Sequence, residues 1–165
     1  MKALNIFKIG IFAVIGALAI AGCGDDSKNS GTSSTPRGLF AKNFSVSTPD
    51  KLEGVWEMSR LEDGDSLKVR MGFDGKIVSV DLQCDIEGET LYASGSSGYS
   101  LGTDPFSNKP TIKFEQPINE KETKNGNSCF INVPGEQELV YTLSGLTMVI
   151  SDVFDSATLK KIGDL

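Results

Sequence analysis

The feature that most constrains the fold is a strict two-residue alternation of apolar and polar side chains. In residues 67–74, LKVRMGFD, every odd position is apolar and every even position is polar or glycine. In residues 78–86, VSVDLQCDI, the even positions carry the apolar side chains. Alternation of this length is typical of antiparallel strands that bury one face. Between the two runs, Asp74-Gly75 predicts a two-residue hairpin turn, because both residue types tolerate positive φ.

Similar turn signals recur along the chain. They stand at residues 63–64, 87–88 and 144–145, each between alternating runs. Further strands are predicted at residues 111–116, 129–133, 138–143, 146–151 and 157–162. No segment after residue 22 shows a helical stripe, so residues 51–165 are predicted to form an all-β domain of eight or nine strands.

Sequential strands that fold back on one another form an antiparallel up-and-down meander. Such a meander can stay open, split into a sandwich or close into a barrel, and closure is favoured because it removes exposed strand edges. Two segments interrupt the strand pattern, the Gly- and Ser-rich residues 95–110 and the polar residues 119–128. We expect both to be loops, either plain surface connections or binding elements held by the scaffold.

The N-terminal segment has the layout of a secretory signal. Residues 1–22 carry Lys2 and Lys8, no acidic residue, and an apolar run at 9–21 whose 13 residues are too few to span a bilayer. Residues 20–23, IAGC, resemble the bacterial lipobox, in which the cysteine receives a diacylglycerol and becomes the mature N-terminus. The resemblance implies that residues 1–22 are removed and that Cys23 carries the acyl chains. An ordinary buried cysteine after a signal peptide is the alternative.

A lipid-anchored N-terminus places the protein in the cell envelope. Two or three acyl chains would anchor it firmly, because each buried methylene contributes about 0.8 kcal/mol. In the sorting pattern of such lipoproteins an aspartate after the acylated cysteine retains the protein in the inner membrane. Gly24 takes that place here, so the expected location is the periplasmic face of the outer membrane.

Residues 23–50 are predicted to be the lipidated N-terminus and a flexible linker. From Gly24 onward the segment is rich in Ser, Thr, Gly, Asn, Lys and Pro, a composition typical of an unfolded spacer. Most of its few apolar residues lie between Leu39 and Phe44. The alternative is that residues 39–44 dock on the domain as an extra strand.

The other two cysteines are predicted to form a disulfide. Cys84 and Cys129 both lie on the apolar side of their strands, and with Cys23 assigned to lipid the remaining count is even. The bacterial periplasm is oxidising. A Cys84–Cys129 bond would close a loop of 45 residues and contribute roughly 4 kcal/mol through loop-closure entropy. Two separate buried thiols remain the alternative.

Charge and composition exclude several functions. Without residues 1–22 the chain has 14 basic and 22 acidic side chains, a formal charge of −8, which disfavours nucleic acid and anionic lipid surfaces. The absence of histidine removes the commonest general base and metal ligand. The acidic clusters at residues 62–65 and 152–155 lack calcium-loop spacing. We therefore expect no catalysis, no metal site and no cofactor.

Gly54-Val55-Trp56 resembles the Gly-x-Trp motif near the start of lipocalins and their bacterial relatives. The resemblance implies a barrel in which Trp56 closes one end against a basic side chain of the last strand, here Lys160 or Lys161. It also implies a small hydrophobic or amphipathic ligand. The side chains expected to line its site share the inward face of the strands: Leu67, Val69, Met71, Phe73, Val80, Leu82, Phe114, Tyr141 and Met148.

A second resemblance concerns residues 93–100, ASGSSGYS, which are similar to the Ser- and Gly-rich loop of membrane-bound bacterial lysozyme inhibitors. It implies that Ser94 or Ser96, together with Lys109, enters the cleft of a partner enzyme. The sequence thus leaves two hypotheses. The barrel binds a small ligand or an envelope protein without catalysis, or the protein is a periplasmic interaction or inhibitor module that acts through residues 94–110.

Overall fold

The computed structural model of the chain describes residues 37–46, 50–62, 64–136, 138–152 and 155–165. The predicted signal peptide, Cys23 and the first part of the predicted linker lie outside the described residues. Among the residues that are described, no helix has the length and apolar character needed to cross a bilayer. The elements, in chain order, are η1 (Gly38–Ala41), β1 (Gly54–Glu62), β2 (Asp65–Phe73), β3 (Ile77–Ile86), β4 (Glu89–Thr103), β5 (Pro110–Phe114), β6 (Ile118–Lys124), β7 (Asn127–Val133), β8 (Glu138–Ser144), β9 (Thr147–Ser151) and β10 (Ser156–Gly163).

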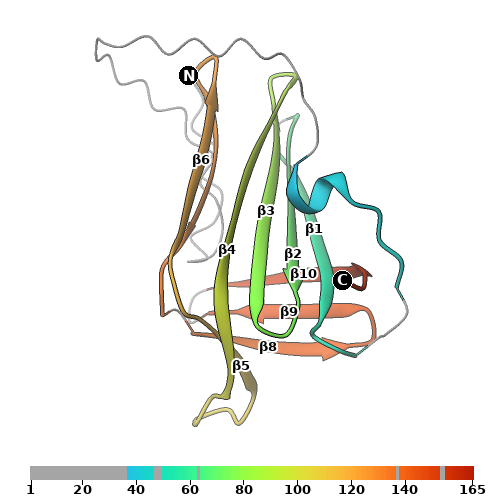
Figure 1. Cartoon of the computed structure of the whole chain (residues 1–165), viewed down its shortest axis with the longest axis vertical. Helices are drawn as coiled ribbons and strands as arrows, with labels where there is room; N and C mark the ends of the chain where they lie inside the picture. The colour runs from blue at the N-terminus through green and yellow to red at the C-terminus, as the bar shows by residue number, and fades with distance from the viewer. Residues whose placement is uncertain (1–36, 47–49, 63, 137, 153–154) are drawn as a thin grey trace.

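Eight of these strands form a closed antiparallel barrel, in the order β1-β10-β9-β8-β5-β4-β3-β2. The barrel closes where β10 pairs with β1, with Trp56 opposite Lys161. Figure 1 shows β1–β4 upright, with β8–β10 crossing behind them. The predicted all-β, up-and-down barrel is therefore confirmed.

The alternating runs 67–74 and 78–86 form the paired strands β2 and β3, as predicted, with Phe73 opposite Val78 and Leu67 opposite Cys84. The turn is longer than the predicted two residues, since residues 74–76 separate the strands. Asp74 stabilises it by accepting hydrogen bonds from the backbone N–H groups of Lys76 (3.0 Å) and Ile77 (2.7 Å). Gly75 has a φ of 96°, a backbone conformation that residues with a side chain rarely adopt.

The barrel contains an inserted hairpin, of which the sequence predicted only the second strand, residues 129–133. Residues 119–128 were expected to be a loop, and this is wrong: β6 and β7 form a separate two-stranded sheet, with Ile118 opposite Val133. Only Ile118 of β6 is buried, so the strand carries no apolar alternation. The hairpin lies beside β4 (Figure 1). It approaches so closely that a Cβ at Gly95 would lie 2.2 Å from the Ile118 Cγ2 atom.

The second predicted loop, residues 95–110, is also mostly strand. β4 continues through the Gly- and Ser-rich sequence to Thr103, which pairs with Pro110 of β5. Its inward positions hold small side chains, since Ala93 and Ser97 are buried beside Gly95. Only residues 104–109 form the connection, and Figure 1 shows this hairpin projecting from the lower end of the barrel.

The core is one continuous cluster of inward side chains from the barrel and from β7. Cys129, Ile131 and Val133 of β7 join the same cluster as the inward residues of β2 and β3. The largest side chains with almost no exposed surface include Trp56 and Phe114. Since burial of one large apolar side chain contributes roughly 1.5–3 kcal/mol, this cluster is the main source of the fold's stability.

Candidate functional site

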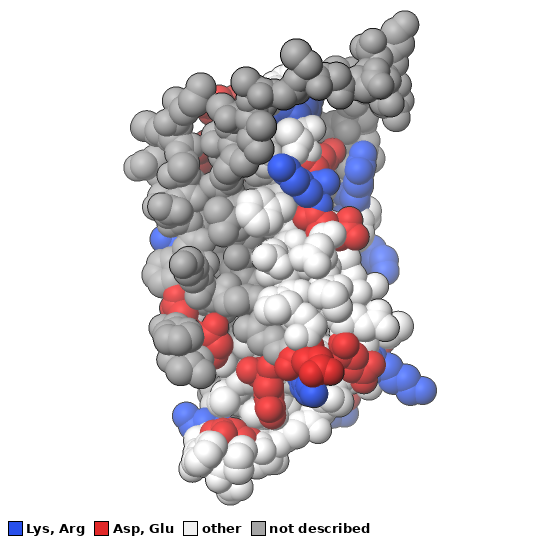
Figure 2. Space-filling view, turned by 90° about the vertical axis from the view of Figure 1, so that its left-hand side faces the viewer, with Lys and Arg blue, Asp and Glu red and all other residues white. Residues whose placement is uncertain are grey.

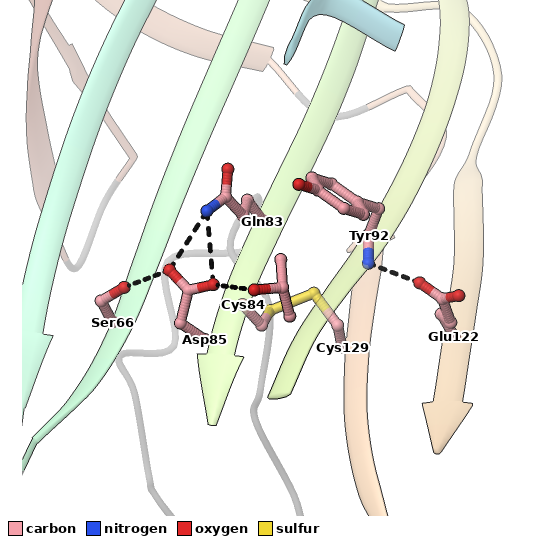
Figure 3. The surroundings of a disulfide bond; sticks show 8 residues. Ser66, Gln83, Cys84, Asp85, Tyr92, Glu122 and Cys129 are labelled. Atoms are coloured by element: carbon pink, nitrogen blue, oxygen red, sulfur yellow. Dashed lines mark hydrogen bonds between the residues drawn. A yellow bond between two sulfur atoms is a disulfide. The ribbon is translucent and has the colours of Figure 1, made fainter. Parts of the chain in front are cut away.

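The disulfide joins the inserted hairpin to the barrel. The Cys84 and Cys129 sulfur atoms are 2.08 Å apart, and the Cα atoms are separated by 5.8 Å. Because Cys84 lies on β3 and Cys129 on β7, the bond fixes the hairpin against the inner face of the sheet (Figure 3). The predicted pairing is confirmed.

Two sets of polar contacts lie near the disulfide (Figure 3). Asp85 accepts hydrogen bonds from Ser66 (2.8 Å) and Thr90 (2.7 Å). Burial alone would raise the pKa of Asp85, but these bonds and those from Gln83 lower it overall. The backbone N–H of Tyr92 donates to the Glu122 carboxylate. The site therefore has a structural role: it ties β2, β3, β4 and the inserted hairpin together.

The nine side chains expected to line a ligand site lie inside the core. Leu67, Val69, Met71, Phe73, Val80, Leu82, Phe114 and Met148 are each at most 1% exposed, and Tyr141 is 9% exposed. All nine belong to the same packed cluster. These residues therefore contact one another, and the inward face of the described strands is filled by side chains.

Trp56 and Lys161 meet at the seam where the barrel closes. The Lys161 Nζ atom lies 5.6 Å from the centroid of the Trp56 ring, and the indole N–H donates to the Leu52 carbonyl oxygen at 2.8 Å. The buried ammonium also contacts the Asp164 carboxylate at 3.1 Å. Of the two lysines considered, Lys161 takes this position, whereas Lys160 is exposed and opposite Glu57.

A cavity of about 630 Å³ opens at the end of the barrel where β1 begins. Among the predicted lining residues only Phe73 and Tyr141 contribute to its wall. The other walls come from the ends of β4 and β8 and from residues 50–54 and 164–165. This cavity was not predicted, because its residues are close only after the barrel has closed.

The β4–β5 hairpin presents an exposed aromatic side chain on an ordered tip. Phe106 is 98% exposed. The Asp104 N–H donates to the Lys109 carbonyl oxygen (2.8 Å), and the Asp104 carboxylate accepts from the Ser107 N–H (2.9 Å). Hydrogen bonds from the Ser107 hydroxyl and backbone lower the pKa of Asp104. These hydrogen bonds fold the tip into a compact turn.

The residues that carried the resemblance to lysozyme inhibitors are not brought together. Ser94 and Ser96 lie exposed in the middle of β4, and Lys109 lies at the hairpin tip. Ser96 and Thr103 are seven steps apart along the extended strand, a distance of about 24 Å. A serine and a lysine so far apart would not enter one narrow cleft.

The end of the predicted linker docks on the outside of the barrel. Leu39, in the 3-10 helix η1, is 4% exposed. It lies over the bare backbone of Gly72, where an added Cβ would be 3.2 Å from the Leu39 Cδ1 atom. The sequence leaves open that residues 39–44 dock on the barrel as an extra strand; the structure instead shows the 3-10 turn Gly38–Ala41.

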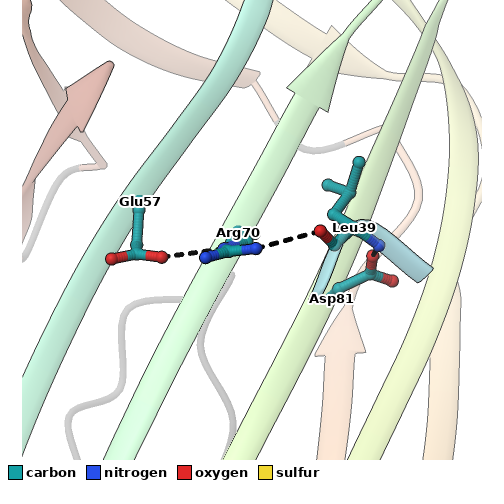
Figure 4. A network of polar contacts seen from close by, with 4 residues as sticks. All are labelled: Leu39, Glu57, Arg70 and Asp81. Carbon is teal, nitrogen blue, oxygen red and sulfur yellow. Dashed lines mark hydrogen bonds and ion pairs between the residues drawn. The ribbon is translucent and has the colours of Figure 1, made fainter. Parts of the chain in front are cut away.

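Two charged side chains hold the backbone of Leu39 from both sides (Figure 4). Its N–H donates to the Asp81 carboxylate, and its carbonyl oxygen accepts from the Arg70 Nη1 atom at 2.9 Å. Arg70 also pairs with Glu57 at 2.7 Å and lies 4.6 Å from the centroid of the Phe40 ring. Burial raises the pKa of Asp81, and its hydrogen bond with Leu39 opposes that rise. We call these contacts of Leu39 and Phe40 with the barrel the linker clasp.

The described residues contain no group of three or more Cys, Asp or Glu side chains placed to hold a metal ion. Comparison of the chain with protein-family models, with curated proteins and with solved structures found no match. The function proposed below therefore depends on the sequence and on the geometry described above.

The linker clasp can be tested by replacing Leu39 with alanine. Loss of its buried side chain should weaken docking by about 2 kcal/mol, which corresponds to roughly thirtyfold in the undocking equilibrium. Amide hydrogen exchange at Leu39 should accelerate by that factor, with core amides of β3 unchanged. Leu61→Ala, at a leucine that is 75% exposed, is the control. Unprotected exchange at Leu39 in the unaltered chain would contradict the clasp.

Proposed function

We propose that the protein is a cell-envelope lipoprotein, anchored through acylated Cys23, whose barrel binds a partner protein with the tip of the β4–β5 hairpin and performs no catalysis. The observation that carries the proposal is the fully exposed Phe106 on an ordered, projecting tip. The proposed location is the periplasmic face of the outer membrane.

Anchoring is supported by the lipobox-like residues 20–23 and by the position of the linker clasp. Because η1 docks on the barrel, only residues 24–36 separate Cys23 from the first docked residues. Thirteen residues span at most about 45 Å, half the reach of a linker that continues to residue 50. The clasp would thus keep the barrel near the membrane surface.

A protein partner is favoured over a ligand inside the barrel because the described inward side chains pack against one another. Exposed aromatic residues are common anchors of protein interfaces. Figure 2 shows that the lower tip of the molecule is mostly uncharged, with a band of acidic side chains above it. The formal charge of −8 without residues 1–22 disfavours insertion of the tip into anionic lipid.

The anchoring proposal predicts the behaviour of a Cys23→Ala variant. Without the thiol no diacylglycerol can be attached, so the variant should remain uncleaved or appear unanchored in the soluble fraction. Membrane fractionation with metabolic labelling by a palmitate analogue measures both effects. Labelling that persists in the variant would show that the acyl chains are not on Cys23.

The partner proposal can be tested by a photocrosslinking amino acid at position 106 of the full chain in the producing cell. We expect a discrete protein adduct at that position. Excess unaltered protein should suppress this adduct by competing for the partner, whereas excess Phe106→Ser protein should not. Position 61 is the matched control, since Leu61 is also exposed. Adducts with lipid alone, or the same adducts from both positions, would overturn the proposal.

A further inference from the structure

The cavity at the end of the barrel has an apolar wall and an acidic rim. Its volume of about 630 Å³ falls within the range of small-molecule sites. The apolar wall comes from strand ends and the residues next to them: Leu52, Phe73, Leu101, Tyr141, Leu143 and Leu165. Leu101 and Leu165 are 58% and 57% exposed, so they leave apolar surface free for contact with a ligand.

The ionisable side chains that line the cavity are strongly unbalanced. Four are acidic, Asp50, Glu53, Asp74 and Asp164, and only Lys51 is basic. Their formal sum is −3 when all are ionised. A cavity with low-dielectric walls concentrates such a field, so the charge disfavours fatty acids and other anions and favours cations.

Three of the four acids have structural partners. The Asp50 carboxylate accepts a hydrogen bond from the Gly145 N–H, Asp74 holds the β2–β3 turn, and Asp164 pairs with Lys161 at 3.1 Å. Glu53 is exposed. Among the contacts of the described residues, its carboxylate has no hydrogen bond or ion pair. Glu53 is thus the acid available to contact a ligand.

The negative charge of Glu53 affects the phenol of Tyr141 in the wall of the cavity. The pKa of the Tyr141 phenol is raised by burial and then by the negative charge of Glu53. Phe73 also lines the cavity, but its ring is fully buried and packs edge-on against Tyr99, with ring centroids 5.3 Å apart, so Tyr141 supplies the accessible aromatic surface. An accessible aromatic ring next to a carboxylate is an arrangement that attracts organic cations.

We propose that this cavity binds a small cationic amphiphile, with its ammonium group beside Glu53 and Tyr141 and its apolar part against the leucine wall. The negative charge of the lining favours a positively charged ligand. The exposed apolar surface of Leu101 and Leu165 favours a ligand with a hydrocarbon portion. The site is separate from the hairpin tip at Phe106, so it does not depend on the proposed partner function.

The proposal is tested by titrating the full chain, held in lipid nanodiscs, with octyltrimethylammonium and with octanoate. Both probes carry the same hydrocarbon chain, and empty nanodiscs supply the blank. Calorimetry should detect saturable binding of the cation, weakened by added salt, and no saturable binding of octanoate. Glu53→Gln should lower the affinity for the cation by about tenfold, as expected for loss of one close charge. Glu136→Gln, an exposed residue outside the cavity, should leave the affinity unchanged.

A charge reversal makes the test independent of any small loss of stability. Glu53→Lys should prefer octanoate over the cation if the carboxylate sets the selectivity. Equal binding of the two probes to the unaltered chain would overturn the proposal. So would unchanged cation affinity in both Glu53 variants, or the absence of cation binding in correctly folded protein, verified by its intact disulfide and circular dichroism.

Discussion

The structure depends on the contact between the inward faces of its strands. Side chains from β2 and β3 meet those of β5, β8, β9 and β10 in a single cluster, and β7 adds Cys129, Ile131 and Val133 to it. Protein interiors pack as densely as organic crystals. A barrel whose inward side chains pack against one another in this way is stable without a ligand in its interior. The binding sites proposed above therefore lie at its end and on the projecting hairpin.

Three surface features follow from this arrangement. The β4–β5 hairpin extends beyond the barrel and exposes Phe106. The strand ends around Tyr141 enclose an acidic cavity. On the outer face, Asp81 and Arg70 hold Leu39, which lies within the segment predicted to be a linker. If Cys23 is acylated, the clasp decides how far the other two features can lie from the membrane.

The sequence predicted those parts of the fold that have an apolar face. Alternation in residues 67–86 gave β2, β3 and their register, and the inward side of Cys84 and Cys129 gave the disulfide. β6 was missed because only Ile118 among its residues is buried, and pairing with β7 holds it in place. The second half of β4 has the composition of a loop because small residues occupy its inward positions, where Ile118 leaves no room for a side chain at Gly95.

The candidate sites were less predictable than the fold. Alternation showed that Leu67, Phe114 and Met148 point inward, but it does not distinguish a filled barrel from a hollow one. The cavity near Glu53 is assembled from five separate segments of the chain, and no local pattern marks it. The clasp has one sequence signal, the apolar residues Leu39 and Phe40 within a polar segment. Its partners Gly72 and Asp81 lie on the outer face of strands, where such residues are common.

The filled interior is tested most directly by titrating the full chain with a fluorescent fatty acid while following the emission of Trp56, the single tryptophan, which is fully buried in the barrel. The account predicts neither saturable probe binding nor quenching of Trp56 beyond that seen with free tryptophan. Saturable quenching that an unlabelled fatty acid reverses would show that the barrel is hollow and would contradict the account.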